Sequence, residues 1–86
     1  MYKIDLRRRA QRGLDRVPSD DFRAVLNAVQ ELANNPRPRG VDKLRSAGGW
    51  WRVRQGDYPI IYDIDDEQKL VTVLHIGHRR EIYRSL

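Results

Sequence analysis

The apolar residues in the first part of the chain recur at the spacing of amphipathic helices. The segment DFRAVLNAVQELANN, which begins at Asp21, repeats its apolar side chains every three or four residues, the pattern of a helix with one buried face. The stretch before it, up to about Val17, has a narrower stripe at spacings of four, four and three, and Pro18 separates the two segments. A helical hairpin is therefore predicted, preceded by a short strand in the alternating segment YKIDL, Tyr2 to Leu6.

From Trp51 onward the period changes to two, which is typical of β-strands. WWRVRQG, YPIIYDI and LVTVLHI follow one another, and the polar segment DDEQK separates the last two. LVTVLHI is apolar on both faces, so it is predicted to be a central strand. Residues 1–86 are thus predicted to form a single α+β domain, in which an N-terminal strand and a helical hairpin pack on one face of an antiparallel β-sheet.

Alternation along the predicted strands assigns side chains to the two faces of the sheet. Trp51 and Val53 are expected to point at the helices, so Arg52 and Arg54 point to the opposite face. If the hairpin has a simple register, Pro59 lies on this same open face. A proline near the start of a strand is compatible with the fold, because a ladder donor is dispensable there or the strand is bulged.

The charge balance is strongly basic and dominated by arginine. The formal net charge is +5, the sequence pI is about 10.1, and only three of the 17 basic residues are lysines. The guanidinium group of arginine binds phosphate through two hydrogen bonds and stacks on aromatic rings. A polyanionic partner, either nucleic acid or an acidic protein, is therefore predicted beside the plainer interpretation of a solvated surface.

Two basic segments flank the predicted strands, and a meander brings them close together. The segment from Lys43 to Arg54 contains four basic residues and no acid, and the last ten residues contain three arginines against Glu81. With Tyr83 and His78 beside these arginines, the two segments predict a pocket for a nucleic-acid backbone and a stacked base. A solvated basic face is the alternative interpretation.

Several classes of function are not expected from the composition. Cysteine is absent, which excludes disulfides and thiolate chemistry and fits a reducing cytoplasm. No window reaches the roughly 20 apolar residues of a membrane span, so no membrane association is expected. His75 and His78 are three residues apart, but a glycine separates the strand of the first from the second. No metal site and no other cofactor are predicted.

The ordered motifs of the second half resemble those of a known superfamily. The stretch KLRSAGGWWRVRQGDYPIIYDIDDEQKLVTVLHIGHRREIYR is similar to the RelE/ParE superfamily of toxins from type II toxin–antitoxin systems. Shared features are a KL before the sheet, an aromatic-basic-apolar-basic strand, a GDY turn and an IGHRRE-type ending, and the helical hairpin with its NNP exit fits too. The resemblance implies an α+β toxin fold and a cognate antitoxin that wraps the toxin with an acidic, partly disordered segment.

The superfamily has two functional branches, and the RelE-like branch is favoured. That branch cuts messenger RNA in the ribosomal A site, using the 2′-OH of the substrate as the nucleophile and no metal. The ParE branch inhibits DNA gyrase and lacks that catalytic set. The expectation is a ribosome-dependent mRNA endoribonuclease. The alternatives are a ParE-like or catalytically weakened toxin that acts by binding gyrase or the ribosome, and an RNA-binding domain without toxicity.

The resemblance also implies roles for individual residues. Arg52 and Arg54 match basic strand residues that bind phosphate and stabilise developing charge. Arg79 in GHRRE matches an arginine that protonates the leaving 5′ oxygen or steadies the phosphorane. Tyr83 matches a tyrosine that acts as base or stacks on the nucleotide, and His78, with an ordinary pKa of roughly 6.5, is the alternative base. The further RNA-binding residues expected are Lys43, Arg45, Arg80 and Arg84.

One position departs from the superfamily pattern. After the strand tyrosine, here Tyr58, the RelE branch has an arginine, whereas this chain has Pro59. Weaker phosphate binding is expected at this position, with Arg45, Arg52 or Arg54 compensating in part. This departure keeps the binding-only alternative open.

Overall fold

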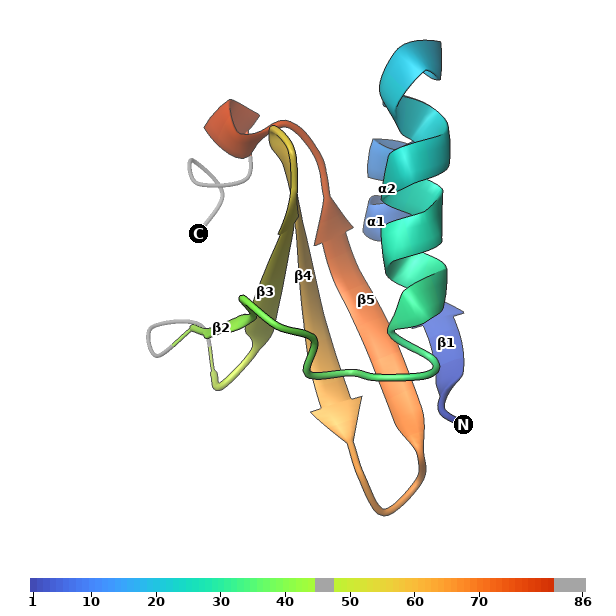
Figure 1. The fold of residues 1–86 in the computed structure, drawn as a ribbon, viewed down its shortest axis with the longest axis vertical. Coiled ribbons are helices and arrows are strands. Elements are labelled where there is room, and N and C mark those ends of the chain that lie inside the picture. The colour runs from blue at the N-terminus through green and yellow to red at the C-terminus, as the bar shows by residue number, and fades with distance from the viewer. Residues whose placement is uncertain (45–47, 82–86) are drawn as a thin grey trace.

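A five-stranded sheet and two α-helices make up the described part of the chain (Figure 1). The computed structural model describes residues 1–44 and 48–81. None of the helices in these residues is both long and apolar enough to cross a membrane. In chain order the elements are β1 (Lys3–Leu6), α1 (Arg8–Asp15), α2 (Ser19–Glu31), β2 (Asp42–Lys43), β3 (Trp51–Gln55), β4 (Tyr58–Asp65) and β5 (Leu70–Ile76).

The strands lie in the order β1-β5-β4-β3-β2. The β3–β4–β5 meander is antiparallel, as predicted, and β5 is flanked by β1 and β4, in agreement with its two-sided apolar pattern. β1, however, pairs with β5 in parallel, with Lys3 opposite Leu70 and Leu6 opposite Val73. The sheet is therefore mixed. Parallel pairing is possible here because a long connection, residues 7–69 with both helices and β2 to β4, joins the two strands.

One hydrophobic core joins both helices to the sheet, which confirms the predicted α+β class. α1 contributes Ala10 and Leu14, and α2 contributes Val25 and Val29, all of them buried. These residues are four apart within each helix, so each pair lies on one helical face. The strand residues in the same core are Ile60, Tyr62, Val71 and Val73.

The segment between α2 and β2 runs across the sheet (Figure 1), and a buried tyrosine anchors it. Tyr62 is fully buried in β4, and its hydroxyl donates a hydrogen bond of 2.7 Å to the carbonyl oxygen of Pro36. Burial raises the pKa of Tyr62 to about 12. The phenol therefore remains a donor at physiological pH, and the buried carbonyl has the partner that it needs.

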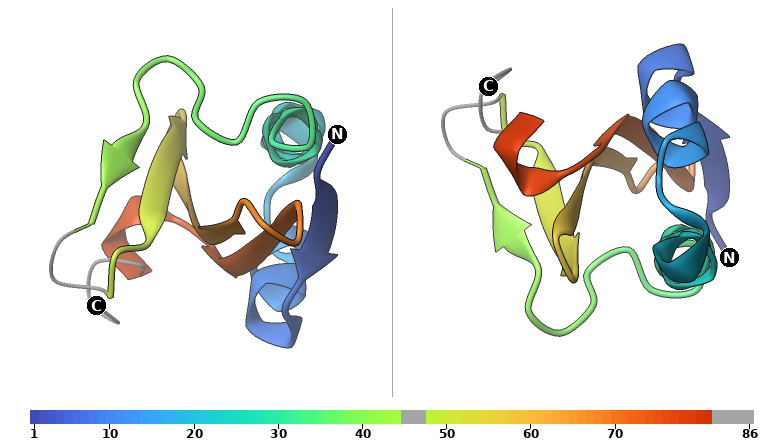
Figure 2. Two further views of the ribbon diagram at one scale, coloured as in Figure 1. Left: turned by 90° about the horizontal axis from the view of Figure 1, so that it is seen from below. Right: turned by 90° about the horizontal axis from the view of Figure 1, so that it is seen from above.

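α1 ends at Asp15 and lies against β5, with the closest approach at Gly13. A β-carbon at Gly13 would lie 1.6 Å from the carbonyl oxygen of Ile76, so no side chain fits at this position. Because Gly13 has no side chain, α1 can pack against the C-terminal end of β5, and the arginines of α1 then lie beside that end of the strand. Both helices and β1 lie toward one end of the twisted sheet, and β2 lies at the other (Figure 2).

Candidate functional site

The two strand arginines share a face of the sheet with Pro59, as predicted. Arg54 lies directly opposite Pro59, and Arg52 lies directly opposite Ile61; residues paired in this way point to the same side. This face is less open than the alternation alone suggested, because Pro59 and Ile61 are both buried while Arg54 is exposed. Pro59 is the second residue of β4 and precedes Ile60, where the pairing with β5 begins, so its missing N–H is compatible with the strand, although its ring is buried.

Arg52 is engaged within the structure. Its side chain is only 15% exposed, and Nη2 donates a hydrogen bond of 2.6 Å to Oδ2 of Asp42. Asp42 and Arg52 are also register partners of β2 and β3, so this ion pair fastens the short strand β2 to the sheet. The hydrogen bond from Arg52 holds the pKa of Asp42 below its ordinary value. Arg54 is consequently the strand arginine with its guanidinium exposed to solvent.

The turn after β5 brings Arg79 to the hairpin that carries Arg54. The backbone N–H of Arg79 donates to the carbonyl oxygen of Asp57 at 2.8 Å, and its Nε lies 3.7 Å from Oδ1 of the same residue. Asp57 lies in the turn between β3 and β4, and Arg54 is the second-last residue of β3. The Arg79 side chain is 60% exposed, and an ion pair this long is weak in water, so the guanidinium remains accessible to a ligand.

His78 also lies near the turn of the β3–β4 hairpin, and two contacts fix the orientation of its ring. Its Nδ1 accepts a hydrogen bond of 3.3 Å from the backbone N–H of Arg80. Its ring packs edge-on against Tyr58, with ring centroids 5.7 Å apart and an angle of 89° between the planes. Because Nδ1 is the acceptor, the proton of the neutral imidazole lies on Nε2. His78 is therefore oriented to donate from Nε2.

The structure brings together some of the predicted residues and separates others. Arg54, His78 and Arg79 all lie near the turn of the β3–β4 hairpin: Arg54 is part of β3, Arg79 contacts Asp57 and His78 packs on Tyr58, with Arg80 exposed beside them. Lys43 lies on β2, where its Nζ is 5.3 Å from the centroid of the Trp51 ring. The predicted site residues that lie outside the described residues are Arg45, Tyr83 and Arg84.

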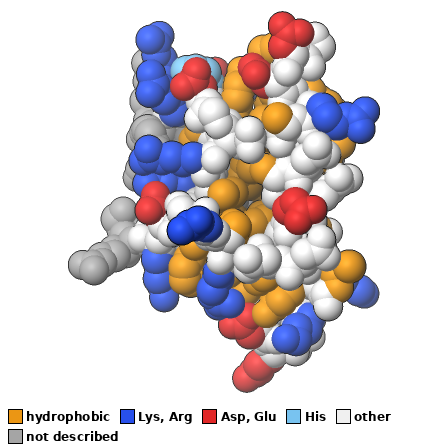
Figure 3. Space-filling view, viewed as in Figure 1, with side chains coloured by type: hydrophobic (Ala, Val, Ile, Leu, Met, Phe, Trp, Pro, Cys, Tyr) orange, Lys and Arg blue, Asp and Glu red, His pale blue; other side chains and the backbone are white. Residues whose placement is uncertain are grey.

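Basic side chains gather along one side of the molecule. Lys and Arg side chains follow the edge that carries β2, β3 and the turn after β5 (Figure 3). Over the described ranges, 1–44 and 48–81, no group of three or more His, Asp or Glu side chains could hold a metal ion. The basic side chains of this edge can donate charge-assisted hydrogen bonds, and His78 adds an imidazole. Such donors are suited to binding phosphates.

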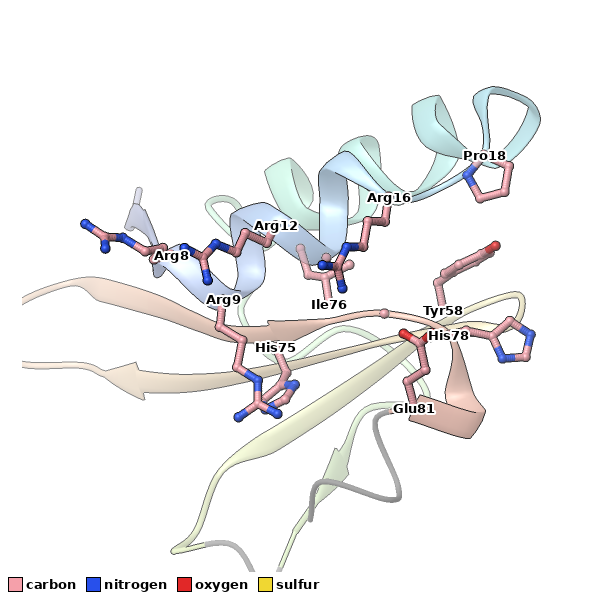
Figure 4. Close-up of a pocket in the computed structure, with 12 residues that line it drawn as sticks. Arg8, Arg9, Arg12, Arg16, Pro18, Tyr58, His75, Ile76, His78 and Glu81 are labelled. Atoms are coloured by element: carbon pink, nitrogen blue, oxygen red, sulfur yellow. The ribbon is translucent and has the colours of Figure 1, made fainter.

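A pocket of about 840 Å³ lies between α1 and the C-terminal end of β5 (Figure 4). This pocket was not predicted from the sequence, in which the arginines of the first helix lie mostly off its apolar stripe. The signal in the sequence is their spacing of four residues on the side away from the apolar stripe, but the residues across the pocket are more than 40 positions away. The side chains that line the pocket include Arg8, Arg9, Arg12, Arg16, Tyr58, His75, His78 and Glu81.

His75 links this pocket to the sheet. It lies opposite Ile61, so it shares the face of Arg52, and it is partly buried at the pocket wall. Burial lowers the pKa of His75, and the positive charge of Arg9 lowers it further. The imidazole is therefore neutral at neutral pH and offers one donor and one acceptor.

Comparison with known proteins assigns the chain to one family. A family model described as "ParE toxin of type II toxin-antitoxin system, parDE" matches residues 4–83. The chain is similar to Toxin RelG of Mycobacterium tuberculosis, with 33% identity over 96% of this chain and 97% of the relative. Toxin RelE of the same organism is also 33% identical, over 96% of this chain and 87% of the relative.

Solved structures agree with the sequence relatives. The RelBE2 toxin–antitoxin complex of Mycobacterium tuberculosis matches with a TM-score of 0.79 and 31% identity, covering 91% of this chain and 98% of the other. The archaeal RelE–RelB complex of Pyrococcus horikoshii OT3 matches with a TM-score of 0.78 and 28% identity, covering 91% and 94%. The strand order and the helical hairpin described above are therefore shared with toxins that were crystallised with their antitoxins.

Proposed function

This chain belongs to the ParE toxin family of type II toxin–antitoxin systems, and because it is similar to toxins named RelG and RelE, we propose that it cleaves messenger RNA on the ribosome. It is a RelE-family toxin of a toxin–antitoxin module. The proposed reaction is attack by the 2′-OH of the substrate on the adjacent phosphate, without a metal ion. The observation that carries the proposal is the position of Arg54, Arg79 and His78 near the turn of the β3–β4 hairpin.

The chemistry of the reaction explains the need for guanidinium groups. In-line attack by a 2′-OH builds negative charge on phosphorus, and fixed donors that face this charge lower the barrier; one such donor contributes about 3–4 kcal/mol in comparable oxyanion sites. Arg54 is exposed, and Arg79 has only a long contact to Asp57. Both can therefore turn toward a phosphate. Because arginine does not lose its proton in proteins, we assign Arg79 to charge stabilisation rather than to proton transfer.

The hydrogen bond at Nδ1 defines the proposed role of His78. A base at Nε2 would require the proton to lie on Nδ1, where the N–H of Arg80 already donates. The neutral ring can instead donate a hydrogen bond from Nε2, so we propose that His78 stabilises the departing 5′ oxygen by this hydrogen bond without losing its proton, and that the 5′ oxygen takes its proton from water. The base is then Tyr83, which the resemblance to the RelE branch implies and which lies outside the described residues.

We further propose that a cognate antitoxin and the ribosome are the partners. The solved relatives are toxin–antitoxin complexes. The net charge of +5 and the basic edge would attract both an acidic antitoxin segment and the phosphates of RNA. Action on ribosomes places the toxin in the cytoplasm, as the absence of cysteine also suggests.

Toeprinting of a defined mRNA in a purified translation system tests the nuclease. We expect cleavage in the A site by the wild type and a loss of about 10²–10³-fold in rate for Arg79→Ala, because one charge-stabilising donor is removed. The backbone bond from residue 79 to Asp57 survives this change, so the fold is retained. Arg23→Ala is the matched control, since Arg23 is an exposed arginine of α2. Full cleavage activity in Arg79→Ala would refute the assignment.

Two observations favour a second candidate function, a toxin that acts by binding. Pro59 replaces the arginine expected on the open face, and Arg52 is held by Asp42. The phosphate would then be held by fewer cations than in the RelE branch. Inhibition of DNA gyrase supercoiling by purified protein, without cleavage in translating extracts, would support this candidate. If the nuclease is only weakened, Pro59→Arg should raise cleavage in a variant whose circular dichroism spectrum is unchanged.

A further inference from the structure

We propose that the pocket between α1 and the end of β5 binds a nucleotide. The phosphate would contact the arginines that follow β1, and the base would pack against the Tyr58–His78 ring pair. Arg54 and Arg79 are not among the residues that line this pocket, which shares His78 with the proposed nuclease site, and binding there requires no cleavage activity. The ligand is either a free nucleotide or one nucleotide of an RNA strand, since both present the same chemistry.

The arginine wall of the pocket lacks carboxylate partners. Arg8, Arg12 and Arg16 are four residues apart, so they follow one side of the helix with a rise of about 6 Å between neighbours. Arg9 adds a fourth guanidinium to the wall. Within residues 1–44 and 48–81, none of these four arginines has a carboxylate oxygen within 4.0 Å. All four are exposed, so solvent screens their mutual repulsion and their guanidinium groups are accessible to an anion such as phosphate, which arginine binds bidentately.

The position of this wall is fixed by the backbone. Gly13 brings α1 into contact with the carbonyl oxygen of Ile76, and the buried Ala10 and Leu14 hold the opposite side of the helix in the core. The arginines therefore project from a rigid element rather than from a loop. A site whose donors are placed before the ligand arrives loses less entropy on binding, which favours affinity for a small anion.

The opposite wall is suited to a base. Figure 4 shows Arg9 and Arg16 extending from the helix on one side, with Tyr58, His78 and Glu81 on the other. The two rings meet edge-on at 5.7 Å, which leaves ring surface for stacking. Neutral His75 and the carboxylate of Glu81 supply acceptors for the N–H groups of a base. The negative charge of Glu81 also places the phosphate at the α1 side of the pocket.

Volume and chemistry together favour a nucleotide over an acidic peptide. The cavity of about 840 Å³ lies within the roughly 300–1,000 Å³ typical of small-molecule sites. An acidic peptide segment would use the arginines alone and would leave the aromatic pair without a role. A nucleotide uses both walls, because it carries a phosphate at one end and a flat heteroaromatic ring at the other.

Calorimetric titration of the purified full chain tests the proposal, with AMP, adenosine, inorganic phosphate and a 2′-O-methyl oligoadenylate as probes. The test variant is Arg9→Ala/Arg16→Ala, and the matched control is Arg23→Ala/Arg39→Ala, which removes the same charge from exposed positions outside the pocket. We expect AMP affinity to fall at least about tenfold in the test variant and less than about twofold in the control, because charge-assisted hydrogen bonds are lost only in the former.

The aromatic wall has its own pair of variants. Tyr58→Phe should keep the preference for AMP over inorganic phosphate, and Tyr58→Leu should lose it. If the oligoadenylate displaces AMP and binds more tightly, the natural ligand is an RNA strand; if AMP binds and the oligomer does not compete, it is a free nucleotide.

Three results would overturn the proposal: no binding of AMP, an equal loss in both arginine double variants, or no effect of Tyr58→Leu. The mRNA cleavage assay is read separately with Arg79→Ala. A failure of the nuclease function with intact AMP binding, or the reverse, therefore distinguishes the two proposals.

Discussion

Replacing Gly13 by alanine should destabilise the protein, although helix propensity predicts the opposite. Gly13 lies inside α1, where alanine is more favourable than glycine by about 1 kcal/mol. In the folded chain, however, the added β-carbon would lie 1.6 Å from the carbonyl oxygen of Ile76, whereas ordinary contact begins at 3.4 Å. The atom in the way belongs to the backbone of β5, so no change of rotamer relieves the clash and the helix has to withdraw.

The expected loss of stability depends on the core contacts that α1 breaks when it moves away from β5. Ala10 and Leu14 are buried under α1 and lose contact with the core when the helix moves away from β5. Overpacking of this kind costs about 1–3 kcal/mol and occasionally more, and a backbone clash belongs at the upper end. After subtraction of the propensity gain, we expect a net loss of about 2 kcal/mol, which corresponds to a fall in Tm of roughly 10 °C for a domain of this size.

Urea unfolding followed by far-ultraviolet circular dichroism measures the effect. Ala24→Gly is the matched control, because Ala24 is exposed on α2 and reports helix propensity without packing; we expect it to lose about 1 kcal/mol. If Gly13→Ala is as stable as the wild type or more so, α1 does not approach β5 as closely as described. In that case α1 would not hold the arginines of the nucleotide pocket in a fixed position, and this argument for the pocket would fail as well.

Three further predictions concern buried and charged groups. Tyr62→Phe removes the hydrogen bond to the buried carbonyl of Pro36 and should lower the free energy of unfolding by about 1–2 kcal/mol in urea titrations; an unchanged value would exclude that bond. Because the pKa of His75 is lowered in the folded state, the unfolded state binds more protons, so stability should fall as the pH drops below 6.5, and His75→Gln should lack this component. Hydrogen bonds from Arg37 and Tyr2 lower the pKa of Asp66 to about 2, so stability present above pH 3.8 should be lost as the pH falls toward 2, whereas Arg37→Gln should weaken this acid dependence.

The candidate site was only partly visible in the sequence. Alternation and a simple hairpin register were enough to place Arg52, Arg54 and Pro59 on one face, and the register confirms this. No sequence pattern indicated that Arg52 binds Asp42, because that contact depends on the short strand β2, which has no periodic pattern of its own. Nor did any pattern indicate that Pro59 is buried.

The nucleotide pocket depends entirely on tertiary contacts. Its arginines come from α1, and its rings come from residues more than 40 positions later in the chain. A helical spacing shows which side of a helix is basic, but it does not show which strand that side meets. The close approach of Gly13 to Ile76 decides this, and a glycine within a helix carries no such information by itself.

The sequence by itself determined the elements, the fold class and the family. Apolar periods of 3.6 and two are local properties, and burial of one face of each element then requires helices packed on a sheet. The tertiary structure alone decided that β1 runs parallel to β5, that Arg79 and His78 reach the β3–β4 hairpin, and that α1 forms one wall of a pocket. These features depend on contacts between distant segments, where strand direction, register and close backbone approach are settled by packing rather than by local pattern.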